Sequence, residues 1–319
     1  MFNSTHTFVG LAIAKFVPQK WVRYSRATAV IAANLPDIDS IAGFWGTAAY
    51  LDHHRGLTHS LIGVPILSLL LAAVIYLFSE NFGRTFAVAL IAMMTHPALD
   101  YLNPYGVRPF LPWNDTWYYG DLVFIIDPYL DLMLLLGLVA AWIWPRRKYA
   151  VTSAALVLAA AYIGLRVERH AVAVSKVQPM FAAIPEGVRK WAVLPTTWNP
   201  QLWDVIVHSD ARLFRFDVDV RDPVRADAPR FRMQSARPSE IVNRAMTATS
   251  SAALLRFARF PVTRVGQIPS GHRVTFLDFR FYRAAAGTAL ASEVLLNQSL
   301  QVIGEDISFV KRISDEPLD

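Results

Sequence analysis

Histidine and aspartate residues recur in the first half of the chain at spacings that suit a metal ion. His96 and Asp100 are four residues apart, so a helix would place both side chains on one face. His54 and His59 lie five apart with Arg55 between them, directly before a long apolar run. Ionisable groups at membrane depth are costly and are usually functional. We therefore expect these residues to form a site rather than to serve packing alone.

Other carboxylates and a further histidine complete the candidate set. The segment Pro36-Asp37-Ile38-Asp39 places two carboxylates at a helix end, and the local backbone decides which one points inward. Asp127 and Asp131 form another pair four residues apart. Asp131 could instead pair with a neighbouring helix. His6 is a further candidate ligand, which could likewise serve as a hydrogen-bond partner between helices. The predicted metal ligands are His6, Asp37, His59, His96, Asp100 and Asp127, and the predicted catalytic residues are Arg55, His54 and Asp39.

The donor types limit the metal and the reaction. The chain contains no cysteine, so thiolate sites are excluded, and histidine with carboxylate suits Zn²⁺ first and Mn²⁺ second. Such an ion brings the pKa of its bound water toward about 7 and polarises a carbonyl or phosphoryl oxygen, which hydrolysis at neutral pH requires. Arg55 could form a forked contact with a phosphate group. The set therefore predicts metal-dependent hydrolysis.

The composition indicates a membrane protein. Hydrophobic residues make up 54% of the chain and charged residues 18%, below the quarter usual in soluble proteins. Residues 1–165 hold only 10 of the 31 Lys and Arg residues and 9 of the 25 Asp and Glu residues. The net charge of +6 is spread out, with no motif for nucleic acid. The amino terminus lacks the basic region of a cleavable signal peptide, so we expect the first segment to be retained.

Apolar segments with a helical pattern would position the candidate residues. They are residues 5–17, 27–35, 57–79, 85–102, 122–144 and 149–165, of which 57–79 is the clearest membrane helix. The Pro-, Trp- and Tyr-rich stretch 103–121 is typical of an interfacial loop. We predict a mainly α fold, in which a polytopic helical membrane domain is followed by a small α+β soluble domain.

The predicted domains are a helical membrane domain that carries the site (1–168), a linker with an amphipathic helix (169–194) and an α+β extramembrane domain (195–319). Alternating apolar residues predict strands at 202–207, 213–220, 274–282 and 301–311, and a helical period predicts a helix at 241–257. If the helices alternate in direction, eight of the ten basic residues of the membrane half lie opposite the His/Asp cluster. Because basic loops mark the cytoplasmic side, we expect the cluster and the last domain to be periplasmic.

Several of these strings resemble the YdjM family of LexA-regulated bacterial inner-membrane proteins, which are regarded as metal-dependent hydrolases. The matching strings, within about residues 4–165, are Thr5-His6 followed by Gly10, Pro36-Asp37-Ile38-Asp39, His54-Arg55-Gly56-Leu57-Thr58-His59-Ser60, and His96-Pro97-Ala98-Leu99-Asp100 with Asn103-Pro104 behind it. The resemblance implies an inner-membrane location and a hydrolase whose substrate is poorly defined. Trp198-Asn199-Pro200 and Leu277-Asp278-Phe279-Arg280-Phe281 are similar to the extension of longer members.

The order of the ligands is also distantly similar to the zinc-dependent phospholipase C and P1 nuclease group. His6, Asp37, His59, the His96/Asp100 pair and the Asp127/Asp131 pair follow that group's order. The last pair departs from it, with Asp in place of His and of Glu, and the amino-terminal amine used by those enzymes is not expected to be available from Met1. The similarity favours phosphoester chemistry.

Three functions remain open at this point. The first is a membrane hydrolase that acts on a lipid or another phosphoester substrate, with membrane lipids as partners and no nucleic acid. The second is a metal-ion transporter or sensor that uses the same His/Asp cluster. In the third, the site has lost its activity and the external domain works as a binding module.

Overall fold

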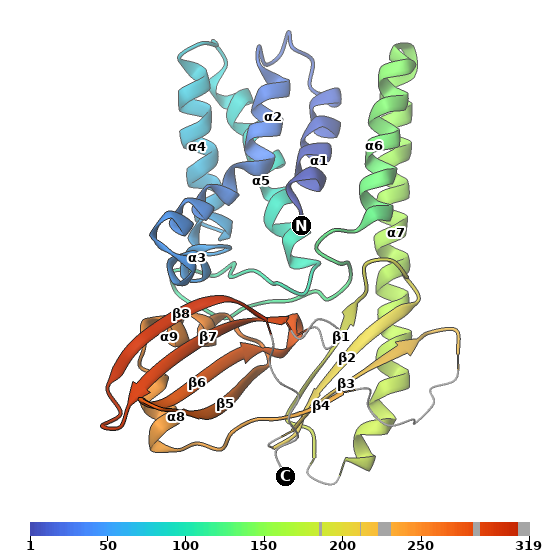
Figure 1. Cartoon of the computed structure of the whole chain (residues 1–319). Helices are drawn as coiled ribbons and strands as arrows, with labels where there is room; N and C mark the ends of the chain where they lie inside the picture. The colour runs from blue at the N-terminus through green and yellow to red at the C-terminus, as the bar shows by residue number, and fades with distance from the viewer. Residues whose placement is uncertain (185–186, 211, 223–230, 283–287, 312–319) are drawn as a thin grey trace.

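The computed structural model describes residues 1–184, 187–210, 212–222, 231–282 and 288–311, and it consists of a helical bundle followed by two β-sheets (Figure 1). The helices of the first part are α1 (Asn3–Phe16), α2 (Ser25–Asn34), α3 (Thr47–His53), α4 (Gly63–Tyr76), α5 (Phe82–Tyr101), α6 (Pro128–Ile143) and α7 (Lys148–Val177). Short 3₁₀ segments join them, among which η1 (Leu35–Trp45) and η2 (Leu57–His59) matter for the site.

Small residues bring α1, α2 and α5 into close contact. A Cβ atom at Gly10 of α1 would lie 2.8 Å from the carbonyl oxygen of Ala29 and 2.9 Å from the Cβ of Ala33, both in α2. Fully buried Ala32 of α2 and Ala89 of α5 belong to the same apolar cluster. Small residues let helix backbones approach closely, which is the usual basis of helix packing in membranes.

The apolar run at residues 57–79, predicted as one membrane helix, is instead broken. Its first turn is η2, and α4 begins only at Gly63. Between them, Leu61 donates its backbone N–H to Pro109, and Gly63 donates to the Ser60 side-chain oxygen. These hydrogen bonds replace those of a continuous helix. The chain therefore bends by 77° between the segments Thr47–His59 and Gly63–Tyr76.

Among the residues that the structure describes, two helical segments are long and apolar enough to cross a membrane, Phe82–Tyr101 and Pro145–Ala182, and the bent pair would make a third. The second of them extends well past the predicted apolar segment that ends at residue 165. The predicted domain boundary at residue 168 lies inside α7, so the expected linker begins as a continuation of this helix. A 3₁₀ segment, η4 (Gln178–Ala183), follows it.

The second part contains two four-stranded antiparallel sheets with strands in sequence order. The first is β1 (Lys190–Pro195), β2 (Leu202–His208), β3 (Arg212–Asp219) and β4 (Phe231–Gln234), and the second is β5 (Pro261–Ile268), β6 (Gly271–Asp278), β7 (Thr288–Asn297) and β8 (Val302–Lys311). The α+β prediction is confirmed. The predicted helix 241–257 is two helices, α8 (Glu240–Ala245) and α9 (Thr249–Phe257).

Alternating side chains place the two sheets between helices. One face of the first sheet, including Trp203 and Val205, packs on the end of α7. Its other face packs on the second sheet through residues such as Ile206 and Leu277. The far face of the second sheet packs on α8 and α9. The layers are therefore α7, sheet, sheet and the α8/α9 pair, with side chains filling each interface.

In Figure 1 the second part lies at the end of the bundle where α3 and the loop after α5 lie, and its first sheet is beside the end of α7. Leu51 of α3 joins the apolar cluster around α9, and Arg256 of α9 forms an ion pair with Asp52. The connections α1–α2, α4–α5 and α6–α7 lie at the other end (Figure 1). These three connections and the adjoining helix ends carry the eight basic residues Lys15, Lys20, Arg23, Arg26, Arg84, Arg146, Arg147 and Lys148.

Candidate metal centre

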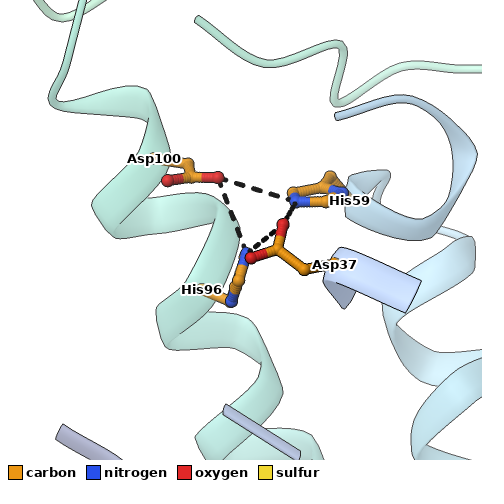
Figure 2. Close-up of side chains that lie close together, drawn as sticks. All are labelled: Asp37, His59, His96 and Asp100. Atoms are coloured by element: carbon orange, nitrogen blue, oxygen red, sulfur yellow. Dashed lines mark ion pairs between the residues drawn. The ribbon is translucent and has the colours of Figure 1, made fainter. Parts of the chain in front are cut away.

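Four side chains from three separate elements of the helical part point toward one another (Figure 2). Asp37 comes from η1, His59 from η2, and His96 with Asp100 from one face of α5. Asp37 Oδ1 lies 3.4 Å from Nε2 of both histidines, and Asp100 Oδ2 lies 3.6 Å from the same two atoms. One ligand atom of each residue lies within 4.8 Å of all the others, so a single metal ion could bind all four.

The Nε2 atoms of His59 and His96 face the carboxylates, and the Nδ1 atom of each ring holds the ring in place. His96 Nδ1 lies 2.7 Å from the carbonyl oxygen of Ala33, which can only accept, so Nδ1 must carry the proton. His59 Nδ1 lies 3.2 Å from Asp39 Oδ2. Both Nε2 atoms are therefore free to act as lone-pair donors, and neither has a hydrogen-bond partner although both are buried. A hydrogen bond that fixes the tautomer and the ring is typical of metal-binding histidines.

Asp37 and Asp39 have different roles, which the sequence left open. Asp37 faces His59, His96 and Asp100. Asp39 instead binds residues of the segment 54–58, which leads to His59. Asp39 accepts hydrogen bonds from the backbone N–H of Arg55 at 3.0 Å and from the Thr58 hydroxyl at 2.6 Å, and its Oδ1 lies 2.9 Å from His54 Nδ1. Asp39 therefore orients the η2 segment and its histidine.

Electrostatics favours the ionised form of both carboxylates. Burial opposes ionisation of Asp37, but the imidazoles of His59 and His96, when protonated on Nε2, outweigh it and hold the pKa of Asp37 well below the usual range. The pKa of Asp39 is likewise lowered, because His54 and His59 outweigh its burial. Both side chains are therefore charged at neutral pH, as ligands or partners of a cation must be.

Arg55 binds Asp100, a candidate ligand, rather than standing free for substrate. Its side chain is 3% exposed, and its Nη2 lies 3.1 Å from Asp100 Oδ1. Its Nη1 donates to Asn103 Oδ1 at 3.0 Å and to the Gly106 carbonyl oxygen at 3.3 Å. The guanidinium also lies over the Tyr105 ring, 5.0 Å from its centroid. The expected forked contact with a substrate phosphate is thus not supported by this geometry.

His6 and the amino terminus lie beside the group of four. The His6 ring stacks on His96 with 3.7 Å between centroids, and His6 Nε2 lies 3.4 Å from Asp100 Oδ1. The amine of Met1 forms an ion pair with the same oxygen, contrary to our expectation that it would be unavailable to the site. His6 faces the outer oxygen of Asp100, so its predicted role as a ligand remains a prediction.

Asp127 lies outside the group of four, and its predicted role as a metal ligand is not supported. Its Oδ1 caps α6 by accepting the backbone N–H groups of Tyr129 and Leu130, and its Oδ2 accepts the Tyr162 hydroxyl at 2.9 Å. Burial raises the pKa of this carboxyl. Asp131 instead accepts hydroxyl hydrogen bonds from Ser4 and Thr5, and so ties α6 to α1.

The donor set fits a divalent cation. Two neutral imidazoles and two carboxylates suit Zn²⁺ or Mn²⁺. The unpartnered Nε2 atoms of His59 and His96 and the Oδ2 atom of Asp100 belong to side chains at most 1% exposed. Buried polar atoms without partners are rare and costly, and a bound ion would satisfy them together.

A second, smaller group is formed by Asp37, Asp39 and His54. Asp39 and His54 already bind each other through the atoms a second ion would need, so this group suits the support of the first site better than a second metal.

Sequence reasoning missed several residues of the site. The Ala33 carbonyl is a backbone group that any residue type could supply, so no sequence pattern signals it. Thr58 and Asn103 lie within or just after the recognised strings, but a hydroxyl and an amide next to such motifs are too common to be identified as partners of Asp39 and Arg55.

Comparison with known proteins supports a membrane family for the helical part. A family model described as "YdjM inner membrane protein" matches residues 1–171. The "Uncharacterized protein YfhP" of Bacillus subtilis (strain 168) is 26% identical over 214 residues, which cover 62% of this chain and 65% of that protein. The chain thus spans slightly less than two thirds of this relative's length. No solved structure matches, and the distant similarity to the phospholipase C and P1 nuclease group remains a prediction.

Proposed function

Because the chain belongs to the YdjM family of inner membrane proteins, we propose that it is a membrane-bound hydrolase that depends on a divalent metal ion. The observation that carries the proposal is the convergence of unpartnered, buried donor atoms from His59, His96 and Asp100 on the carboxylate of Asp37. These four residues would hold the ion, with Zn²⁺ the best fit and Mn²⁺ the second. A divalent ion there would supply an acidic water and polarise a phosphoryl oxygen.

Access to the site favours a reaction at its Asp37 side. The Asp37 side chain is 16% exposed and that of His54 is 14%, whereas His59, His96 and Asp100 are at most 1% exposed. Asp39 fixes the orientation of the His54 ring. We infer that His54 would supply a proton to the leaving alcohol and that Arg55 would hold Asp100 in position.

An apolar cavity favours a lipid-borne phosphoester as substrate. A cavity of about 320 Å³ lies between η2, α4 and α5, and it is lined by His59 together with apolar residues such as Val64, Met94 and Ala98. Of the four proposed ligands, His59 lines this cavity. A lipid that diffuses in the membrane plane could place its chain in this cavity and its phosphate at the centre.

We also propose that the protein is multi-pass, with the metal centre and the sheets on the periplasmic side. The support is the separation of the eight basic residues from the cluster along the bundle (Figure 1), together with the rule that basic loops remain cytoplasmic. Transport of the metal is less well supported, because residues 7–14, 27–35, 61–79, 85–95 and 132–144 between the two ends contain no charged side chain.

The proposal is tested by assaying the metal-loaded protein on a phospholipid and on a water-soluble phosphate ester. We expect release of phosphate-containing product that His96→Ala abolishes. Ala98→Trp, which fills the apolar cavity, should lower turnover of the lipid while turnover of the soluble ester is retained. Ala73→Trp, an exposed α4 position outside the cavity lining, is the matched control. Failure of the loaded protein on both substrates would refute hydrolysis of phosphoesters.

A further inference from the structure

A second cavity lies at the opposite end of the bundle from the metal centre. It measures about 720 Å³ and is lined by residues of α1, of the α1–α2 connection, of α6 and of the start of α7. Near the metal centre, Ser4 and Thr5 of α1 hold α6 through Asp131. At the basic end the cavity lies between α1 and the α6–α7 pair. We call this cavity the wedge, because α1 and α6 are joined at one end and the space between them opens at the other.

The walls of this wedge are apolar along the helices and basic at its mouth. Leu11 and Ala14 of α1 and Leu138 and Ala141 of α6 line its depth. The cations Lys15, Lys20, Arg26 and Lys148 line its mouth. Within the described residues, none of these four cations forms an ion pair with a carboxylate, and the Lys148 ammonium lies over the Tyr149 ring at 5.0 Å.

The half-buried positions of two of these cations make the mouth a site for an anion. Lys15 and Lys148 are half-buried, whereas Lys20 and Arg26 are exposed. Partly desolvated cations without partners attract a negative group more strongly than solvated surface lysines. Trp142 and Tyr149 line the same cavity and are exposed, as aromatic residues at the headgroup level of a membrane are.

We propose that this wedge binds one anionic phospholipid, with its phosphate among Lys15, Lys20, Arg26 and Lys148 and its acyl chains against Leu11 and Leu138. The occupant follows from two complementary features. Four unpaired positive charges match an anionic headgroup, and the apolar walls beneath them match hydrocarbon, which a free phosphate ion does not use. Basic pockets between helices on the cytoplasmic side are a recurrent type of lipid site. The proposal depends on the membrane location and not on the hydrolase activity.

Native mass spectrometry of the detergent-purified protein tests the proposal, with equal amounts of phosphatidylglycerol and phosphatidylcholine added. We expect one phosphatidylglycerol to be retained in preference to phosphatidylcholine. The double variant Lys15→Gln/Lys148→Gln should lose affinity for phosphatidylglycerol by about fivefold for each charge removed. The matched control is Arg84→Gln/Arg147→Gln, which removes the same charge at the same end but outside the cavity lining, and which should retain the lipid.

A second variant distinguishes a lipid site from simple attraction of anions. Leu11→Trp fills the apolar depth and keeps all four cations, and it should also lose the phospholipid. Inorganic phosphate should fail to displace the lipid. Equal retention of the two lipids, equal losses in the two double variants, or full retention by Leu11→Trp with displacement by phosphate would each overturn the proposal.

Discussion

At the residue scale, the division of work between Asp37 and Asp39 shows how neighbouring residues of one type acquire different roles. The two carboxylates are separated by one residue in η1, yet one faces the histidine nitrogens of the centre and the other binds Thr58 and the backbone of Arg55. The difference arises from the direction of each side chain on the 3₁₀ segment. It predicts different consequences for the same substitution.

Asp37→Asn should abolish stable metal binding, because it removes the charge of a direct ligand. Asp39→Asn should keep the site but weaken metal affinity by about 10- to 100-fold, as loss of a partner behind a metal-binding histidine typically does. Competition with a fluorescent chelator measures both affinities. Asp52→Asn, which alters only the exposed pair with Arg256, should match the wild type. Equal losses for Asp37→Asn and Asp39→Asn would contradict the assigned roles.

Much of the site could be predicted from residue types and spacing. His59, His96, Asp100 and Asp37 were expected as ligands, and the structure brings these four together. Asp127 was misplaced because a carboxylate before a proline at a helix start fits an N-cap as well as a ligand, and only the packing of α6 decides between them. The role of Arg55 depends on Asn103 and Gly106, which lie 48 and 51 residues away in the sequence.

At the element scale, the packing of α1 against α2 bears on the position of His96, a proposed metal ligand. Gly10 contacts the backbone of Ala29 and the side chain of Ala33, and the Ala33 carbonyl accepts the Nδ1 hydrogen bond of His96. Any group added at Gly10 must therefore push α2 away from α1 and move this carbonyl.

Gly10→Ala should destabilise the protein by about 1–3 kcal/mol through overpacking and should weaken metal binding. Gly164→Ala in α7 is the matched control. It also replaces a helical glycine by alanine, but the added Cβ atom would meet nothing within 4 Å. Thermal melting in detergent and the metal titration should separate the two variants. Similar melting temperatures and metal affinities for both would argue against the close contact.

The elements themselves were predicted unevenly. The helical pattern identified α1, α2 and α5 because each has an apolar face of helical period. The break at Ser60–Gly63 was missed, since it depends on hydrogen bonds to Ser60 and to Pro109 from outside the helix. Strands β1, β4, β5 and β7 were missed as well. Because β7 is buried between β6 and β8 and packs on both faces, its sequence lacks the alternation of a half-exposed strand.

At the scale of the whole molecule, the second part supports the candidate metal centre through aromatic contacts of Tyr105 and a hydrogen bond of Arg280. The Tyr105 ring, which underlies the Arg55 guanidinium, packs on Phe257 of α9 at 5.3 Å and on Phe281 at 5.1 Å between centroids. Buried Arg280 donates to the Pro104 carbonyl oxygen at 2.6 Å and so fixes the same loop. The loop that positions Arg55, and through it Asp100, is therefore held from the sheet side.

Phe257→Ala should consequently weaken metal binding although this residue lies outside the centre. Truncation of a buried phenylalanine also costs about 3–5 kcal/mol of stability, so a control of similar kind is needed. The control is Phe216→Ala in β3. It also truncates a phenylalanine, but one that packs in the apolar cluster against α7 and not on Tyr105. The spectrum of bound Co²⁺, which reports ligand geometry, should change in the first variant only. An unchanged spectrum in Phe257→Ala would contradict the claim that the sheets and α9 help to position the metal centre.

The metal content of the detergent-purified protein tests the central claim most directly. Elemental analysis of the wild type, His59→Ala and Asp100→Ala should give close to one Zn²⁺ or Mn²⁺ per chain in the wild type and a loss of that ion in both variants. His53→Ala, an exposed histidine outside the site, should match the wild type. Absence of metal from the wild type even after reconstitution, or equal metal in all four proteins, would contradict the account and leave the His/Asp cluster as a polar packing network.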